Sequence, residues 1–234
     1  MNSNTRRESG WGRASLGLLM FFLLAADILS IFVGKWLDGR PLSDPAIWST
    51  HWTATIGTFL CSVAIWSAAV LLVVWRARRR GTLTALFSLR LDRRAVALCG
   101  VGLLAVVALK WLEASGSGAA FPAVLREYRG FEHRYVGHGA TVTAFQYLYY
   151  LLESMMVLLI IAFFQRAGEL WTRLSSIPWG ALGLTLTWGL AHFASHPAGA
   201  LTVVMSALLF GFVFLGARKS VVPALVTIYF AFVL

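Results

Sequence analysis

Residues 148–196 have the sequence LYYLLESMMVLLIIAFFQRAGELWTRLSSIPWGALGLTLTWGLAHFASH, which is two apolar runs joined by a short polar turn. The first run holds Glu153, and the second carries His192 and His196 near its end. Ionisable side chains inside such runs are costly unless they face a partner or a wet cavity. These three residues are therefore the first candidates for a functional site.

The composition indicates an integral membrane protein. Of the 234 residues, 59% are hydrophobic and only 13% are charged, whereas a soluble domain carries roughly a quarter charged residues. The net charge is +10, but the basic residues occur in short runs between apolar segments. This distribution is typical of topology signals, so no nucleic-acid partner is expected. The cysteines, Cys61 and Cys99, lie inside apolar runs without metal-ligand spacing and are interpreted as packing residues.

The predicted fold class is all-α, a polytopic transmembrane bundle of about seven helices that forms one integral membrane domain over residues 1–234. Apolar runs of about twenty residues mark membrane-spanning helices. Seven such runs occur, at about residues 16–32, 53–74, 95–112, 142–164, 179–193, 201–215 and 221–234. No small-residue cleavage site follows the first run, which favours a retained helix over a signal peptide.

The distribution of Lys and Arg predicts how the chain is oriented. With a cytoplasmic N-terminus, most of the 20 Lys and Arg residues fall on the cytoplasmic side, as the positive-inside rule requires. The composition is rich in Arg and poor in Lys, and the loops are compact. We therefore expect a multi-pass protein of a bacterial plasma membrane with its N-terminus in the cytoplasm, and membrane lipids as its surroundings.

Two connections between the runs are long. Residues 76–94, RARRRGTLTALFSLRLDRR, alternate arginines with apolar residues and resemble a basic amphipathic segment on the cytoplasmic leaflet. Residues 114–141, ASGSGAAFPAVLREYRGFEHRYVGHGAT, have Gly- and Ser-rich ends and a charged centre. We expect a solvated loop there, with a structured lid as the alternative, because long structured loops are a minority.

The spacing of the second run places its polar residues together. Trp188, His192 and His196 follow at i, i+4 and i+8, so they share one helix face. At about 1.5 Å per residue, the depths of Glu153 and His192 in their helices differ by roughly one to two turns. The same helix carries Gly180, Gly183 and Gly189, small residues that let a neighbouring helix approach closely.

A carboxylate beside an imidazole in a sheltered pocket suits hydrolysis. Glu153 would act as the general base that deprotonates a water molecule, with its proton affinity tuned by His192. His196 could donate a hydrogen bond to the developing oxyanion. A purely structural Glu–His pair that locks two helices is the alternative. A zinc site is less favoured because no His-Glu-x-x-His pattern is present, so neither a metal nor another cofactor is expected.

The last part of the chain, residues 142–234, resembles the CPBP family of intramembrane proteases, which includes CAAX-processing and bacteriocin-immunity-type proteins. That family shows a Glu-Glu-x-x-x-Arg helix and a Phe-x-x-x-His helix. A glycine-rich helix, a short basic turn, a proline and a final His-x-x-x-Asn follow. Here LLESMMV stands at the first motif, and TWGLAHF matches the second with Trp188 in place of Phe. The stretch SALLFGFVFLGARKSVVPALV reproduces the glycine helix, the basic turn and the proline.

The resemblance implies that the glutamate activates water and that histidines and an asparagine complete the site. Glu153 and His192 carry these roles over. Leu152 replaces one glutamate of the first motif, and no arginine follows at the expected place. Thr227 and Ala231 occupy the positions of the third motif, counted from the proline. His196 has no counterpart in the family, so its role is inferred from this sequence alone.

Three functions are consistent with these residues. The first is a divergent intramembrane endopeptidase that hydrolyses a peptide near the membrane interface. The second is a catalytically inactive relative that binds a membrane peptide or a protein partner. The third is a transporter with a polar path through Asp27, Glu153 and His192, which is disfavoured because the other runs hold few polar residues. An enzyme requires the Glu153 carboxylate and the His192 imidazole to lie within about 5 Å of each other, or to be bridged by one water molecule, and to face a cavity. An inactive relative allows the same pair to be tightly packed with no cavity.

Overall fold

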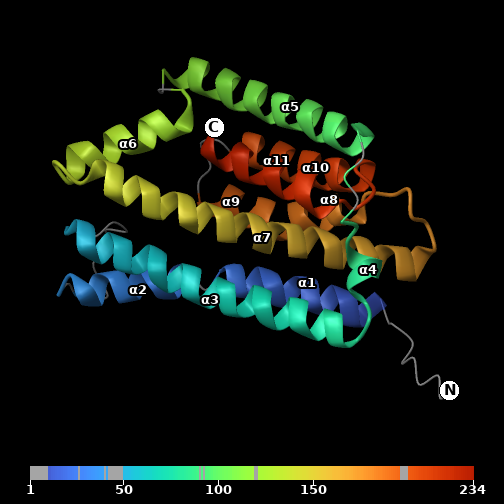
Figure 1. Ribbon diagram of the computed structural model, residues 1–234. Coiled ribbons are helices and arrows are strands. Elements are labelled where there is room, and N and C mark those ends of the chain that lie inside the picture. Colours follow the sequence, from blue (N-terminus) through green and yellow to red (C-terminus); the bar gives the residue numbers. More distant parts are fainter. Residues whose placement is uncertain are drawn as a thin grey trace.

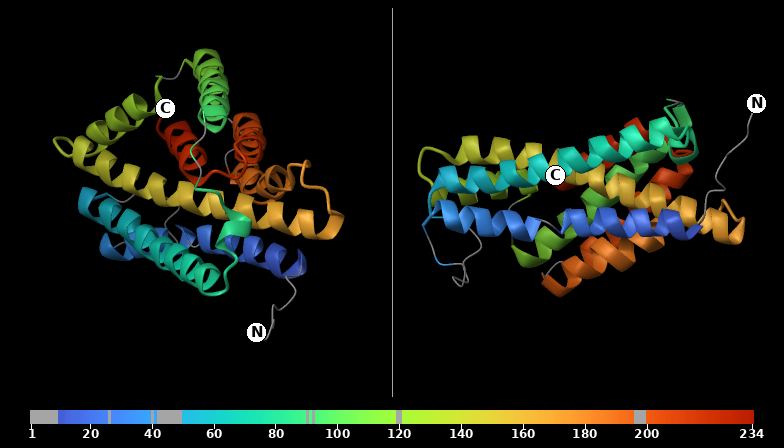
Figure 2. Two further views of the ribbon diagram at one scale, coloured as in Figure 1. Left: turned by 45° about the vertical axis from the view of Figure 1, so that its right-hand side comes forward. Right: turned by 90° about the horizontal axis from the view of Figure 1, so that it is seen from below.

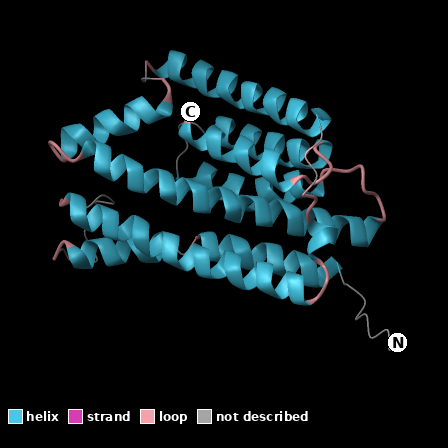
Figure 3. Cartoon of the chain, viewed as in Figure 1, coloured by secondary structure: helices cyan, strands magenta, loops and turns pink. Residues whose placement is uncertain are grey.

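The computed structural model describes residues 10–25, 27–39, 41, 50–89, 91, 93–118, 121–195 and 200–234. This part of the chain is helical and contains no strand, so the predicted all-α class is confirmed (Figure 3). The helices are α1 (Gly10–Leu24), α2 (Asp27–Leu37), α3 (Trp52–Arg79), α4 (Leu83–Leu86), α5 (Arg93–Ser117), α6 (Ala123–Arg134), α7 (Gly139–Thr172), α8 (Trp179–Leu184), α9 (Leu190–Ser195), α10 (Ala200–Gly216) and α11 (Val221–Val233). A π-helical turn, η1 (Thr185–Gly189), joins α8 to α9.

The longest helix, α7, forms the centre of the bundle. It packs against α1 and α3 on one side and against α8 and α11 on the other, while α5 lies outermost over α10 and α11 (Figures 1 and 2). In the most apolar stretch of α7, 61% of the residues are buried, against 28% in α3 and 22% in α5. A helix that is apolar all round is a core helix. The apolar outer faces of α3 and α5 are accordingly left to face lipid.

Three of the described helices are long and apolar enough to cross a membrane: α3, Arg93–Gly116 of α5, and α7. They contain the predicted runs at 53–74, 95–112 and 142–164. Helix is also found within each of the other four runs, in shorter pieces. The run at 16–32 is divided between α1 and α2, and the run at 179–193 is α8, η1 and α9.

The loop predicted over residues 114–141 is wrong, because α5 extends into it and α6 occupies its centre. Phe131 and Tyr135 of this segment are buried against Phe59 of α3 and Val142 of α7. The carboxylate of Glu132 accepts hydrogen bonds from the backbone N–H groups of residues 137 and 139, at 2.7 and 2.9 Å. These bonds satisfy amides around the start of α7 that lack an intrahelical partner, which holds α6 against α7.

Within the basic connection over residues 76–94, residues 76–79 end α3, Leu83–Leu86 form the short helix α4, and residues 93–94 begin α5. Beyond α4, the backbone N–H of Ser88 donates to the carbonyl of Lys219 at 2.8 Å, and the N–H of Val221 donates to the carbonyl of Ser88 at 2.9 Å. This connection is therefore held against the turn between α10 and α11.

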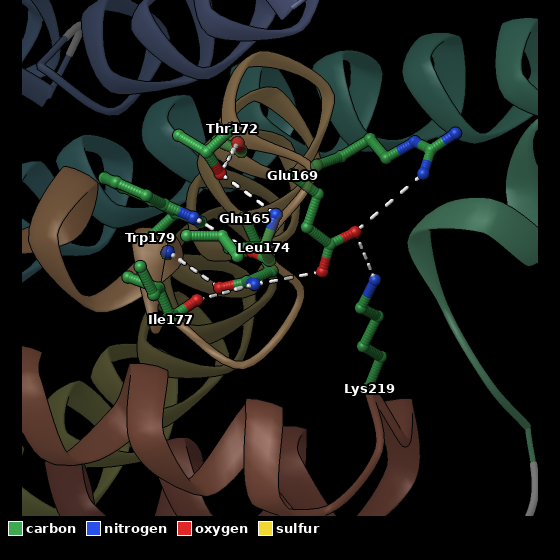
Figure 4. Close-up of polar contacts among 10 residues, drawn as sticks. Gln165, Glu169, Thr172, Leu174, Ile177, Trp179 and Lys219 are labelled. Atoms are coloured by element: carbon green, nitrogen blue, oxygen red, sulfur yellow. Dashed lines mark hydrogen bonds and ion pairs between the residues drawn. The ribbon is translucent and has the colours of Figure 1, made fainter.

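Buried polar contacts fix the corner between α7 and α8 (Figure 4). The side chain of Gln165 donates to the carbonyl of Ile177 and accepts from the N–H of Gly180, both at 3.0 Å. One helical turn further, Glu169 accepts a hydrogen bond from Gln165 and forms an ion pair with Lys219, whose Nζ lies 2.7 Å from Oε2. The corner ties α7 to α8 and to the turn before α11, so it sets how the second apolar run packs on the first.

Candidate functional site

A polar cavity of about 750 Å³ lies between α7 and the helices around it. Glu153 of α7 and His192 of α9 both line it, so the structure brings two of the three predicted site residues into one pocket. The third, His196, lies outside the described residues, and so does the side chain of Asp27.

Trp188 connects these two side chains. Its indole Nε1 donates to Oε1 of Glu153 at 3.3 Å, and its ring lies against the imidazole of His192 with the centroids 4.4 Å apart. Glu153 is only 6% exposed and Trp188 4%. A hydrogen bond from a donor that is itself locked by packing fixes the orientation of a buried carboxylate. Trp188 thus positions Glu153 at the wall of the cavity.

The hydrogen bond of His192 determines its tautomer. Nδ1 lies 3.0 Å from the backbone carbonyl of Trp188. Because a carbonyl oxygen only accepts, Nδ1 carries a proton, and in the neutral imidazole Nε2 is then the acceptor nitrogen. His192 can therefore orient a water molecule through Nε2 while Nδ1 holds the ring in place.

The π-helical turn η1 contains Trp188. It inserts one extra residue into the helix, which rotates everything after it by about 100° relative to an uninterrupted α-helix. Gly180 and Gly183 pack against Ile161 and Phe164 of α7, as the sequence predicted, whereas Gly189 makes no such close approach.

Three further residues of the cavity were not predicted from the sequence: Glu127 of α6, and Gln146 and Tyr150 of α7. The hydroxyl of Tyr150 donates to Oε1 of Glu127 at 2.7 Å and accepts from Nε2 of Gln146 at 2.9 Å. The other side-chain oxygens, Oε2 of Glu127 and Oε1 of Gln146, are buried and have no hydrogen-bond partner among the described residues. Two acceptors in this state call for a donor from a bound molecule or from water.

Burial raises the pKa of Glu127, while the hydrogen bond from Tyr150 and the positive charges of Lys110 and Arg126 act in the opposite direction.

The sequence contains one pattern that points to Glu127 as a residue of the site. Glu127, Phe131 and Tyr135 are spaced four apart, which places them on one face of a helix. That face is the one that α6 turns towards α7.

Both signs of charge line the cavity. Lys110 and Glu113 belong to its wall together with Arg126 and Arg134. Nζ of Lys110 donates to the backbone carbonyl of Phe232 at 3.4 Å. A cavity with several donors, several acceptors and aromatic walls suits a polar chain such as a peptide better than a hydrocarbon tail.

The positions of the third family motif contribute little chemistry. Ala231 lines the cavity with a methyl group, where the family pattern has a polar residue. The hydroxyl of Thr227 donates to the carbonyl of Pro223 at 2.9 Å and lies 3.3 Å from the carbonyl of Cys99, which directs it towards α5. Neither side chain can take over the role that the resemblance implies for the motif.

No group of three or more His, Cys, Asp or Glu side chains that could hold a metal ion occurs within the described ranges. Comparisons of the chain with models of protein families, with curated proteins and with solved structures found no match.

Proposed function

We propose that this protein is a divergent intramembrane endopeptidase of the CPBP type, which hydrolyses a peptide near the membrane interface with a water molecule activated by Glu153. The single observation that supports the proposal most is that Glu153 and His192, which come from separate helices, line one cavity of about 750 Å³. A pair that merely locked two helices would need no such space.

In the proposed reaction, Glu153 accepts a proton from the water as the water oxygen bonds to the carbonyl carbon of the scissile peptide. The carbonyl π electrons move to its oxygen, which becomes an oxyanion. The second O–H of the water donates a hydrogen bond to Nε2 of His192, which orients the water oxygen towards the carbonyl carbon. The oxyanion then re-forms the C=O double bond as the C–N bond breaks, and the proton held by Glu153 passes to the leaving nitrogen. Lys110 and Arg126 supply positive charge within the same cavity.

The proposal includes a location. All seven apolar runs would pass through or into a bacterial plasma membrane, with the N-terminus in the cytoplasm. The three long apolar helices support a membrane setting, and the surplus of arginines at one end of α3 supports the orientation. The helix α6 then lies on the outer side, over the cavity. The substrate would be a peptide or protein segment embedded in, or close to, the outer face of the membrane.

A catalytically inactive relative that binds a membrane peptide or protein is the second candidate. It is favoured by the methyl group of Ala231 at the cavity wall and by the hydroxyl of Thr227, which bonds within α11 and towards α5. In that case the unpartnered acceptors on Glu127 and Gln146 would bind the peptide without cleaving it.

The test uses the purified full chain in detergent with a peptide library, and products are read by mass spectrometry. We expect wild type to release products and Glu153→Gln to release none, because the amide cannot accept the water proton. Glu132→Gln is the matched control, since this carboxylate holds backbone amides between α6 and α7. His196→Ala measures the contribution of the third predicted site residue.

Equal product from wild type and Glu153→Gln would remove the protease proposal. Peptides that are retained by both proteins but cleaved by neither would establish the binding function instead.

A further inference from the structure

A second cavity of about 750 Å³, separate from the polar one, lies on the other side of α7. Its wall is formed by α3, α4, α7 and α11 and the segment after α4. The lining is almost wholly apolar, with side chains such as Val70, Val74, Leu158 and Leu225. Its volume lies within the range of sites that hold small organic ligands.

The polar groups at this cavity are few and are mostly engaged. Thr84 and Ser88 supply its two hydroxyl-bearing side chains. The backbone N–H and C=O of Ser88 already bond to Lys219 and Val221. A peptide placed here would leave its own backbone groups without partners, which costs several kcal/mol for each group in an apolar setting. An occupant made mostly of hydrocarbon carries no such cost.

Basic residues stand at one end of the cavity. Val70, Val74 and Arg78 follow at i, i+4 and i+8 on α3, so they share a face, and Arg78 lies about 6 Å beyond Val74 along the helix axis. Arg76, Arg79 and Arg80 are exposed at the same helix end. No carboxylate of the described part of the chain forms an ion pair with Arg78. Clusters of Lys and Arg at a helix end attract anionic lipid headgroups.

We propose that this cavity is a binding site for an anionic phospholipid, with an acyl chain between α3, α7 and α11 and the headgroup phosphate against Arg78. The arginines at the end of α3 favour an anionic headgroup, and the apolar lining favours a hydrocarbon chain. An anionic phospholipid has both. The lipid would fasten the connection over α4 to the bundle. This site does not depend on the hydrolytic proposal, because it shares no lining residue with the polar cavity.

The experiment is native mass spectrometry of the full chain in detergent micelles that contain equal amounts of dioleoyl phosphatidylglycerol and dioleoyl phosphatidylcholine. For wild type we expect bound phosphatidylglycerol to exceed phosphatidylcholine by about fivefold or more, the factor that one basic residue near an anionic headgroup contributes. Arg78→Gln should lower this preference by about fivefold. Arg76→Gln removes the same charge from the opposite face of α3, so it should lower the preference less.

A second pair of variants tests the acyl chain. Val70→Trp fills the cavity and should abolish the retention of both lipids, whereas Leu71→Trp adds the same side chain on the exposed face of α3 and should leave retention unchanged. If Val70→Trp fails to fold, Val74→Trp at the more exposed part of the lining replaces it. Equal retention of the two lipids by wild type would overturn the proposal. Equal losses of lipid preference in Arg76→Gln and Arg78→Gln would also overturn it. So would equal losses of lipid retention in Val70→Trp and Leu71→Trp.

Discussion

The indole nitrogen of Trp188 lies 3.3 Å from Oε1 of Glu153, and this bond joins two helices across 35 residues of sequence. Both side chains are buried. A buried carboxylate that loses a donor suffers the full cost of its desolvation, whereas an exposed one turns to water. The bond therefore contributes both to the stability of the bundle and to the geometry of the cavity.

Trp188→Phe keeps the aromatic ring and removes the donor. We expect the free energy of unfolding in detergent to fall by about 1–2 kcal/mol, because the hydrogen bond from the indole to Oε1 of Glu153 is then lost. A double-mutant cycle with Glu153→Leu, which removes the acceptor, should give a coupling energy of about 0.5 kcal/mol or more. Trp36→Phe, on an exposed side chain of α2, is the control and should have little effect. Strictly additive effects would show that the bond contributes nothing to stability.

Glu127 makes the stability depend on pH. Because burial raises the pKa of Glu127 in the folded protein, the protonated form is favoured there. The stability that Glu127 contributes to the folded protein is fully present below the unfolded-state pKa of about 4.3. It is lost as the pH rises through the higher pKa of Glu127 in the folded state. We expect Glu127→Gln to gain stability relative to wild type over that interval, measured as unfolding temperature from pH 4 to pH 8.

Tyr150→Phe sharpens this test. The hydroxyl donates to Glu127 and favours its ionised form, so its removal should move the titration of Glu127 to still higher pH. A difference between wild type and Glu127→Gln that stays constant from pH 4 to pH 8 would contradict the assignment.

Gly211 of α10 allows α8 to approach closely. A Cβ atom at this position would overlap the backbone of Ala181, which cannot give way as a flexible side chain can. We expect Gly211→Ala to destabilise the protein by about 1–3 kcal/mol or more through overpacking. Gly100→Ala on α5 is the matched control, because its Cβ meets nothing within 4 Å. That variant should be neutral or slightly stabilising, since alanine favours a helix interior. Equal losses of thermal stability would rule out this close approach as the cause.

The ion pair between Lys219 and Glu169 is partly buried, with the Glu169 side chain 8% exposed. Lys219→Met keeps most of the aliphatic length and removes the charge. We expect a loss of about 1–3 kcal/mol, because Oε2 of Glu169 is then left with the weaker contact from Arg166 at 3.8 Å, while Oε1 keeps its hydrogen bond from Gln165. Arg166→Met, which removes that weaker partner, should cost less. The two variants are compared by chemical unfolding, and the reverse order would contradict the geometry.

The helical class was predictable from residue type alone. Runs of apolar residues must satisfy their backbone groups internally in a membrane, and helices do so. Helix occurs within every predicted run for this reason. The helix α6 was not predicted because its charged residues are typical of a solvated loop. The spacing of Glu127, Phe131 and Tyr135 gains meaning only when a neighbouring helix packs against that face. It also gave no sign of η1, since a π-turn follows from packing between helices rather than from propensity.

By itself, the sequence determined that this chain is helical and apolar. It also determined that Glu153 and His192, which are ionisable residues inside apolar runs, need a polar partner or a cavity. Only the tertiary structure decided which partners they have. Trp188, within η1, donates to Glu153, and the corner at Gln165 holds the second run against α7. Helix formation is a local property of residues a few positions apart. The meeting of side chains on separate helices depends on how those helices pack, which local residue pattern does not specify.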